Sequence, residues 1–294
     1  MSALTHLYRE CRLCPGNCGT DRTAGRKGFC GESDQLRAAA ACLHFGEEPP
    51  LVGLHGSGTV FFSGCTLRCR CCQNYQISND HLGAVLSTTE LAEIFKALAD
   101  EGASNINLVT ATHFIPGIAA ARESFLKNNP AVPFVWNSSG YERIEMLEIL
   151  HDMIDVYLPD FKVMSEHGSR ELFKRSDYPV YAAEAVREMV RVKKLRWDGD
   201  RLVRGVIIRH LVIPGREDES EAFLSWFAEH IGDQALLSVL LQYIPLENGR
   251  NTAGTKVTDR LQDHILTLLD RYGIEDGFVQ EISKTDEWIP DFTP

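Results

Sequence analysis

Two patterns of apolar and polar positions alternate along this chain. From about Gly58 onward, short continuous apolar runs are separated by segments in which apolar residues recur at helical spacing. Continuous apolar runs of this length predict strands that are buried on both faces of a parallel sheet. Six strands are predicted, at Thr59–Ser63, Ile106–Ala111, Phe134–Ser138, Val156–Phe161, Val206–Ile213 and Ser238–Ile244.

The segments between these runs predict helices. Ser87–Glu90 has the pattern of a capping box, and Leu91, Ile94, Phe95 and Leu98 follow it on one helical stripe. Five further helices are predicted, at Ala119–Asn128, Arg143–Asp152, Val180–Lys194, Glu219–Ile231 and Val257–Tyr272. The alternation predicts an α/β fold, a partial (β/α)6 TIM-like barrel with a parallel sheet. Catalytic residues in such folds gather at the carboxyl ends of the strands.

The N-terminal region differs from this pattern. Residues 1–35 are polar, rich in Cys and Gly, and show no clear helical period. We therefore predict a small Cys-rich metal-binding segment at residues 1–50 and a barrel at residues 51–250. A C-terminal helix and tail, residues 251–294, are expected to pack on the barrel.

Composition narrows the class of protein. The chain of 294 residues is 44% hydrophobic and 24% charged, which is typical of globular proteins and excludes a disordered or low-complexity one. A net charge of −11 argues against a nucleic-acid binder that depends on phosphate contacts. No apolar run is long enough to span a membrane, and the first twenty residues lack the apolar core of a secretory signal. We therefore expect a cytoplasmic protein without a membrane partner.

The nine cysteines are the most informative residues. Eight fall into two clusters, and none follows Cys72. A secreted disulfide scaffold spreads its cysteines over a small fold, so this distribution indicates metal or iron–sulfur ligation instead. Cys42 stands alone in the apolar run Ala38–Leu43, and we expect it to be an ordinary buried residue.

The second cluster follows the first predicted strand directly. Cys65, Cys69 and Cys72 have the spacing C-x3-C-x2-C, which lets a compact loop turn three thiolates toward one cubane cluster. Cubane [4Fe–4S] clusters usually take four thiolates, so three leave one iron open to an external ligand. A zinc site or buried free thiols are the alternatives.

This loop resembles that of the radical S-adenosylmethionine (radical SAM) superfamily, C-x3-C-x-aromatic-C. Here Cys71 occupies the aromatic position, and we treat it as a non-ligand. The resemblance implies that Cys65, Cys69 and Cys72 hold a [4Fe–4S] cluster whose open iron is chelated by S-adenosylmethionine (SAM). Reductive cleavage of SAM would then yield a 5′-deoxyadenosyl radical that abstracts a hydrogen from a substrate.

A narrower resemblance concerns the pyruvate formate-lyase activating enzyme-like group, the activases of glycyl radical enzymes. His44–Pro50, Gly56–Cys65, Cys72–Tyr75 and the C-terminal Trp288–Phe292 are similar to that group. It implies a backbone glycine of a partner glycyl radical enzyme as substrate and a flavodoxin or ferredoxin-type reductant. Two alternatives stay open: a small molecule or another protein residue as substrate, and a metal-binding or redox-relay protein that does not cleave SAM.

The resemblance also implies contacts with SAM. Asn137 and Ser138 match an Asp-Thr-Asn-Gly segment of activases, and Asp160 and Lys162 match an Asp-x-Lys segment. A ligand between these two charges explains both better than a salt bridge does. Arg209 or His210 could reach the SAM carboxylate or ribose. Strand alternation turns one of this last pair inward and the other outward.

One segment of the family is missing from this chain, and the roles of several other residues stay undecided. The Gly-Gly-Glu segment that usually binds the SAM amino group is absent, which is the only support for the redox-relay alternative. Thr110, Thr112 and His113 stand in its place as candidates for polar contacts, and His113 opening the next helix is the alternative. For Glu47 and Glu48, a solvated loop or pairing with arginines is preferred over catalysis. Two residues are expected either to line the substrate mouth or to close the barrel, Gln242 and Tyr243.

The first cysteine cluster forms a separate set of four thiols. Cys11, Cys14, Cys18 and Cys30 have the spacing C-x2-C-x3-C-x11-C, and glycines supply turns between them. Four thiolates suit either tetrahedral zinc or a fully ligated iron–sulfur cluster. Because the segment is too short to bury a core, a metal would stabilise its fold. Zinc and an auxiliary cluster both stay open, and free thiols are the lesser alternative.

Overall fold

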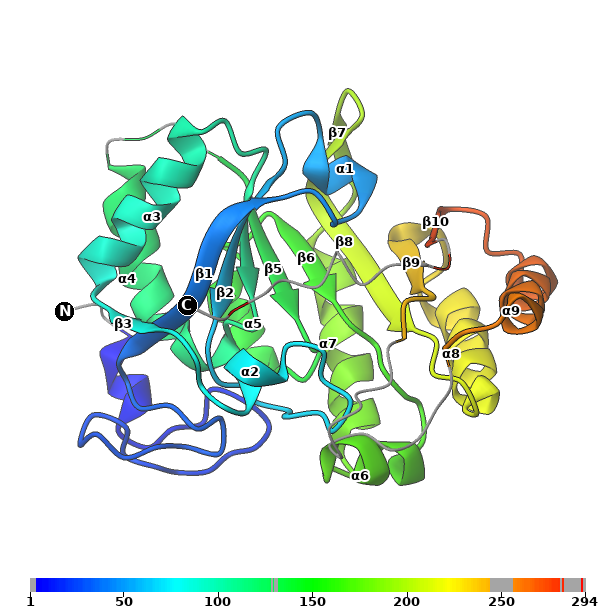
Figure 1. The fold of residues 1–294 in the computed structure, drawn as a ribbon, viewed down its shortest axis with the longest axis horizontal. Helices are drawn as coiled ribbons and strands as arrows, with labels where there is room; N and C mark the ends of the chain where they lie inside the picture. The colour runs from blue at the N-terminus through cyan, green and yellow to red at the C-terminus, as the bar shows by residue number, and fades with distance from the viewer. Residues whose placement is uncertain are drawn as a thin grey trace.

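A mixed β-sheet organises the protein. The computed structural model describes residues 4–127, 129, 132–243, 256–280, 282 and 292. Across this part of the chain the strand order is β10-β9-β8-β6-β5-β4-β2-β1-β3, and β7 pairs with β8 (Figure 1). The strands are β1 (Leu36–His44), β2 (Ser57–Phe62), β3 (Ala84–Leu86), β4 (Ile106–Val109), β5 (Phe134–Ser138), β6 (Val156–Pro159), β7 (Arg196–Asp198), β8 (Arg201–Leu211), β9 (Leu236–Leu240) and β10 (Gly277–Val279).

The sheet is mainly parallel and open. β2, β4, β5, β6, β8, β9 and β10 pair in parallel, whereas β1 is antiparallel to β2 and β3, and β7 is antiparallel to β8. The six predicted strands correspond to β2, β4, β5, β6, β8 and β9, which confirms an α/β fold of the partial-barrel kind. β1, β3, β7 and β10 were not predicted. The predicted last residue of β9, Ile244, lies outside the described residues.

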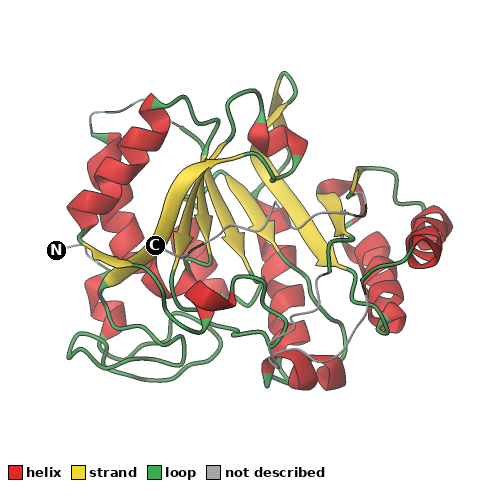
Figure 2. Ribbon diagram, in the orientation of Figure 1, coloured by secondary structure: helices red, strands yellow, loops and turns green. Residues whose placement is uncertain are grey.

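Helices cover the outer face of this sheet (Figure 2). The capping box at Ser87 is confirmed, because Ser87 and Glu90 each accept a hydrogen bond from the other's backbone N–H. The fourth helix begins earlier than predicted, at Ile115, because Pro116 suits the first turn of a helix. The helices are α1 (Pro49–Val52), α2 (Tyr75–Ser78), α3 (Thr88–Asp100), α4 (Ile115–Leu126), α5 (Ile144–Leu150), α6 (Glu166–Phe173), α7 (Tyr178–Val192), α8 (Glu217–His230) and α9 (Asp259–Tyr272), with short 3-10 turns at Thr5–Tyr8, Thr112–Phe114 and Gly232–Gln234.

Alternate residues of the strands point to two different cores. Trp136, Tyr157 and Ile208 pack outward in the large core shared with the helices. Val135, Leu158 and Ile207 point inward and form a second cluster with Leu51 of α1. Because side chains alternate along a strand, the residues two positions after these inward ones share their face. Asn137, Asp160 and Arg209 therefore lie beyond the apolar cluster, toward the carboxyl ends of the strands.

The Cys-rich N-terminal segment lies beside the carboxyl ends of the strands (Figure 1). It is joined to the barrel, because Tyr8, Cys11 and Leu13 are part of the main core. Cys42 is exposed, so the expectation of a buried thiol was wrong. Within the described residues, β3 pairs only with Leu36–Ala38, so the second half of β1, with Cys42, has no strand partner on that side in this part of the chain. Among the described residues, no helix combines the length and the apolar character that crossing a membrane requires.

Candidate functional site

The loop after β2 folds around the sulfur of Cys65. β2 is buried along its whole length and ends at Phe62, and Gly64, two residues later in the loop, has φ +79°. A Cβ on Gly64 would lie 2.6 Å from Cγ of Glu32 and 2.8 Å from the carbonyl oxygen of Cys30, so only glycine fits there. The backbone N–H groups of Leu67 and Arg68 then donate to Cys65 Sγ, each at 3.4 Å. Donors aimed at a sulfur favour its thiolate form.

The other two thiols of the predicted cluster lie close by. Cys72 accepts a hydrogen bond from Ser78 Oγ at 3.2 Å, and its own backbone N–H donates to the carbonyl of Cys69. Burial raises the pKa of the Cys65, Cys69 and Cys72 thiols, and the charge of Lys162 opposes this in each case. The loop therefore presents three protonated thiols beside a cation, an arrangement that stabilises thiolates once a metal displaces the protons.

These thiols line a cavity of about 260 Å³ at the carboxyl ends of the parallel strands. Cys65, Cys69, Cys71 and Cys72 form one side of it. Among the described residues, no three Cys, His, Asp or Glu side chains converge on one metal position as they stand. The three thiols would have to turn toward one another to hold a cluster, and the cavity provides the space. The donor set, the N–H groups around Cys65 and the open volume fit a cluster with three protein ligands.

Six of the other sequence-predicted site residues lie on the wall of the same cavity. They come from the ends of successive strands: Thr110 after β4, Asn137 and Ser138 in β5, Asp160 and Lys162 after β6, and Arg209 in β8. Strand register brings them together, since Val109 pairs with Asn137, and Asp160 bridges to Arg209. Parallel strands align their carboxyl ends at one edge, which explains how residues about 100 positions apart share one wall.

Asp160 and Lys162 form a salt bridge, with Lys162 Nζ 2.5 Å from Asp160 Oδ2. The expectation that the two charges would not pair with each other was therefore wrong. They stand two positions apart, and extended backbone places both on the cavity side. Burial lowers the pKa of the Lys162 ammonium, but the charge of Asp160 is the largest of the effects that oppose burial, and the net pKa lies well above its usual value. Lys162 is thus a permanent cation between the thiol loop and β6.

Arg209 is held by two buried carboxylates that precede β2. Arg209 Nε and one terminal nitrogen each lie 2.7 Å from Glu48, and the same nitrogen contacts Glu47. The side chains of Glu47 and Glu48 are only 6% and 5% exposed. Asn107 of β4 also donates to Glu47 at 2.8 Å. Pairing with arginine, the preferred interpretation of these two glutamates, is the arrangement in the structure.

Three predicted site residues lie away from the cavity wall. His210 points outward, where it is hydrogen-bonded to Phe161 O and Ser220 Oγ and stacks on Phe223. The sequence did not decide which of Arg209 and His210 points inward; in the structure it is Arg209. Thr112 donates to Glu142 at 2.6 Å, within the short turn that also holds His113.

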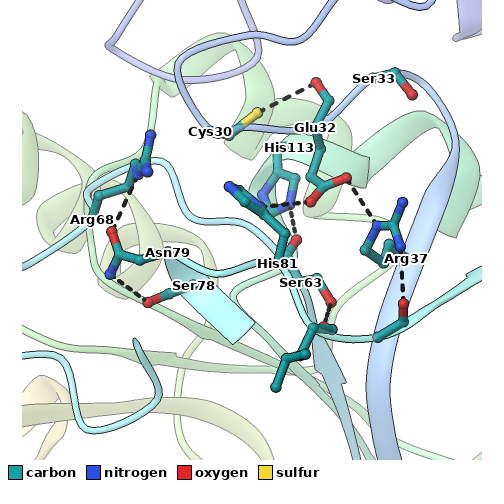
Figure 3. A network of polar contacts seen from close by, with 12 residues as sticks. Cys30, Glu32, Ser33, Arg37, Ser63, Arg68, Ser78, Asn79, His81 and His113 are labelled. Atoms are coloured by element: carbon teal, nitrogen blue, oxygen red, sulfur yellow. Dashed lines mark hydrogen bonds and ion pairs between the residues drawn. The ribbon is translucent and has the colours of Figure 1, made fainter. Parts of the chain in front are cut away.

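His113 also has a structural setting. It lies in the turn that precedes α4, with Nε2 2.7 Å from the carbonyl oxygen of Ser63 (Figure 3). Burial, with a smaller contribution from Arg22, lowers the pKa of His113 to about 3. A histidine buried in this neutral state supports the loop before Cys65 from behind.

Other wall residues were not identified from the sequence as site residues. Gln73 Nε2 donates to the carbonyl of Gln242 at 3.0 Å, which joins the thiol loop to the segment after β9. Gln242 therefore lines the cavity and helps to close the barrel, while Tyr243 is buried. Gln73 could have been found from its position directly after Cys72. Gln280, which follows β10, gave no such signal.

Comparison with known proteins places the chain in a family. The sequence model of the Radical SAM superfamily matches residues 59–227, more than half of the chain. The uncharacterized protein MJ0674 of Methanocaldococcus jannaschii is 28% identical over 92% of this chain and 77% of its own length.

Solved structures share the fold. SuiB of Streptococcus suis bound to the precursor peptide SuiA has a TM-score of 0.51 at 13% identity, over 74% of this chain and 46% of SuiB. SuiB bound to S-adenosylmethionine has a TM-score of 0.50 at 14% identity, over 74% of this chain and 48% of SuiB. This chain thus spans about half the length of SuiB. The sequence match runs from β2 to α8, a region that carries the thiol loop and most of the cavity wall. The chain therefore belongs to the radical SAM superfamily.

Proposed function

We propose that this protein reductively cleaves SAM and uses the resulting radical to abstract a hydrogen from a substrate. Superfamily membership supports SAM-dependent radical chemistry and implies both SAM and a [4Fe–4S] cluster. The observation that carries the proposal is the cavity in which three thiols face the charged ends of β6 and β8. When bound, the reduced cluster supplies the electron that cleaves SAM to a 5′-deoxyadenosyl radical.

In this proposal Cys65, Cys69 and Cys72 hold the cluster. The N–H groups of Leu67 and Arg68 and the hydroxyl of Ser78 hydrogen-bond two of the three sulfurs. Hydrogen bonds to the sulfurs of iron–sulfur clusters are one of the means by which a protein sets their reduction potential. Cys71 lies on the same wall and is left without a ligand role.

SAM would then lie across the strand ends. Asp160 uses one oxygen on Lys162, and the Lys162 ammonium has three donors, so both keep capacity for a polar ligand. The Arg209 guanidinium is engaged by two glutamates, so we assign it to positioning the wall beside Asp160. Thr110 is the one candidate for the missing Gly-Gly-Glu contact that lies on the wall, next to Asn137 and Ser138.

The test is anaerobic purification, reconstitution with iron and sulfide, and assay of 5′-deoxyadenosine from SAM and dithionite. Wild type should form it, and Cys69→Ala should lose both the cluster absorbance and the product. Cys71→Ala should keep both, as should Cys42→Ala, a control for the loss of a thiol remote from the site. Loss of the cluster in Cys71→Ala alone would show that the ligand assignment is wrong. A fully loaded wild type that forms no 5′-deoxyadenosine with or without candidate substrates would favour the redox-relay alternative.

The substrate class is the finer part of the proposal. On the resemblance of Gly56–Cys65 and Cys72–Tyr75 to the activases, we propose a backbone glycine of a partner glycyl radical enzyme. The partner should show a protein radical by electron paramagnetic resonance after incubation with the reduced enzyme and SAM. A flavodoxin or ferredoxin-type protein should replace dithionite. Active SAM cleavage with no radical on any candidate partner would turn the search to small molecules or other protein residues.

A further inference from the structure

A fully buried arginine lies inside the N-terminal Cys-rich segment. Arg22 is 0% exposed, and its guanidinium donates to the carbonyl oxygens of Ser33 and His113. It also lies over the Tyr8 ring, 4.6 Å from the ring centroid. Within the described part of the chain, no carboxylate forms an ion pair with it. Because a guanidinium is always charged in proteins, a buried one without an anion is costly.

The groups that can supply negative charge to Arg22 are thiols. One terminal nitrogen of Arg22 lies 3.6 Å from Cys11 Sγ. A Cβ on Gly28 would lie 3.8 Å from Arg22 Cδ, 3.2 Å from Cys18 Sγ and 3.5 Å from Cys30 Sγ, so these sulfurs and the arginine chain surround one point. Cys14 follows Cys11 by three positions in the same segment. Three of the four cysteines of the first cluster, Cys11, Cys18 and Cys30, thus lie around the buried cation. No three of these sulfurs, all within the described residues, converge on one metal position as they stand, so the side chains would have to turn toward one another to hold a metal.

We propose that Cys11, Cys14, Cys18 and Cys30 form a closed metal–thiolate centre and that Arg22 is its buried counter-cation. Four thiolates around a zinc ion, or around a [4Fe–4S] cluster, carry a net negative charge, part of which the Arg22 guanidinium would offset. Cys18 is exposed and Cys11 and Cys30 are buried, so the centre would lie at the surface with Arg22 on its protein side. This inference does not depend on the proposed function of the barrel.

The proposed centre is linked to the thiol loop of the barrel. The carbonyl oxygen of Cys30 accepts the backbone N–H of Cys65 at 3.2 Å. Two residues after Cys30, the buried Glu32 is anchored to Arg37 and, at 2.8 Å, to His81 (Figure 3). Metal at the four cysteines would therefore hold rigid the segment that supports Cys65 from behind.

The first experiment counts metal in the full chain without the barrel cluster. In the triple variant Cys65→Ser, Cys69→Ser and Cys72→Ser, any tightly bound metal belongs to the N-terminal set. We expect about one zinc, or about four irons with a cluster absorbance, per chain. Adding Cys18→Ser should abolish this content, whereas adding Cys42→Ser, which also replaces an exposed thiol, should leave it unchanged. A folded triple variant that binds neither metal after anaerobic reconstitution would overturn the proposal.

The second experiment tests the role of the arginine in the same background. Arg22→Met removes the charge but keeps an apolar chain, and Arg22→Lys keeps the charge. Arg22→Met should lose metal to a competing chelator at about tenfold lower chelator concentration than the parent, with Arg22→Lys in between. Equal retention in all three would disprove the counter-cation role. If Arg22→Met does not fold, Arg22→Gln, which also removes the charge but keeps a hydrogen-bond donor, takes its place, and the Cys18→Ser count still tests the metal centre.

Discussion

The carbonyl oxygen of Cys30 accepts the backbone N–H of Cys65 at 3.2 Å, so the last cysteine of the N-terminal set supports the first cysteine of the barrel loop. Gly64 lies at this contact, with its own N–H bonded to the carbonyl of Ile77. The N-terminal segment is therefore part of the scaffold that positions the thiols. Changes in this contact should affect the barrel cluster even when the three ligands are intact.

Substitution of Gly64 tests how tightly this contact is packed. Gly64→Ala would place a Cβ within 2.8 Å of both Glu32 and the Cys30 carbonyl, in addition to the roughly 1–2 kcal/mol that a left-handed backbone costs a non-glycine residue. We expect loss of cluster incorporation and a clear drop in thermal stability. Gly215→Ala is the matched control, because φ is +82° there and no atom lies within 4 Å of the added Cβ. Equal effects of both substitutions would contradict the packing argument.

Arg209 should stabilise the fold through Glu47 and Glu48. Arg209→Met leaves two buried carboxylates without their cation, and removing one partner of a buried ion pair costs about 3–5 kcal/mol. The free energy of unfolding at pH 7, measured by urea denaturation, should fall by about that amount. Further substitution with Glu47→Gln and Glu48→Gln should recover part of the loss. No change in Arg209→Met would show that the network contributes nothing to stability.

The same network should impose a pH dependence. Burial raises the pKa of Glu48, but Arg209 outweighs it and the net pKa lies below the usual value. The stabilisation is therefore fully present above the unfolded-state pKa of about 4.3 and is lost as the pH falls through the lower folded-state value. In Arg209→Met, burial is opposed only by the hydrogen bonds of Glu48 to Ser238 and to the backbone, so we expect the sign to reverse and stability to fall as the pH rises. Urea denaturation of both proteins between pH 3 and 8 measures the two slopes.

The pH dependence of stability that Glu142 contributes to the wild type should have the opposite sign to that of Glu48. Burial raises its pKa to about 7, although Thr112 and Trp136 donate hydrogen bonds to it. For an acid with a raised folded-state pKa, the stabilisation is full below about pH 4.3 and is lost as the pH rises to about 7. Glu142→Gln stays neutral, so it should be about 3 kcal/mol more stable than wild type at pH 8 and equal to it at pH 4. Equal stabilities of wild type and variant at both pH values would show that burial does not raise the pKa of Glu142.

Lys162 should contribute to SAM binding in the reconstituted protein. Lys162→Met removes a cation that lies between Asp160 and the Cys69 thiol, so we expect the SAM dissociation constant to rise by about tenfold or more, equivalent to about 1.4 kcal/mol. Binding is measured by equilibrium dialysis with the cluster content of each sample matched. Lys174→Met, at an exposed position, is the control. Unchanged affinity in Lys162→Met would exclude Lys162 from the SAM site.

Local patterns sufficed for much of the fold and for part of the site. Apolar runs predicted the six parallel strands, because strands buried on both faces need apolar residues at every position. β1 and β3 escaped prediction, since β3 has only three residues and β1, which contains the apolar run Ala38–Leu43, precedes the region in which strands alternate with helices. The placement of Asn137, Asp160 and Lys162 on one wall followed from their positions at strand ends. Their roles toward SAM stay predictions.

The sequence by itself determined the alternation of strands and helices and the two cysteine sets, since both depend on spacings within about a dozen residues. Only the tertiary structure decided which side chains meet over long separations. It turned Arg209 rather than His210 into the cavity, joined Arg209 to Glu48 across 161 positions, and buried Arg22 among the N-terminal thiols. These contacts depend on strand register and on the path of the loops, which arise from packing of the whole chain rather than from any local pattern.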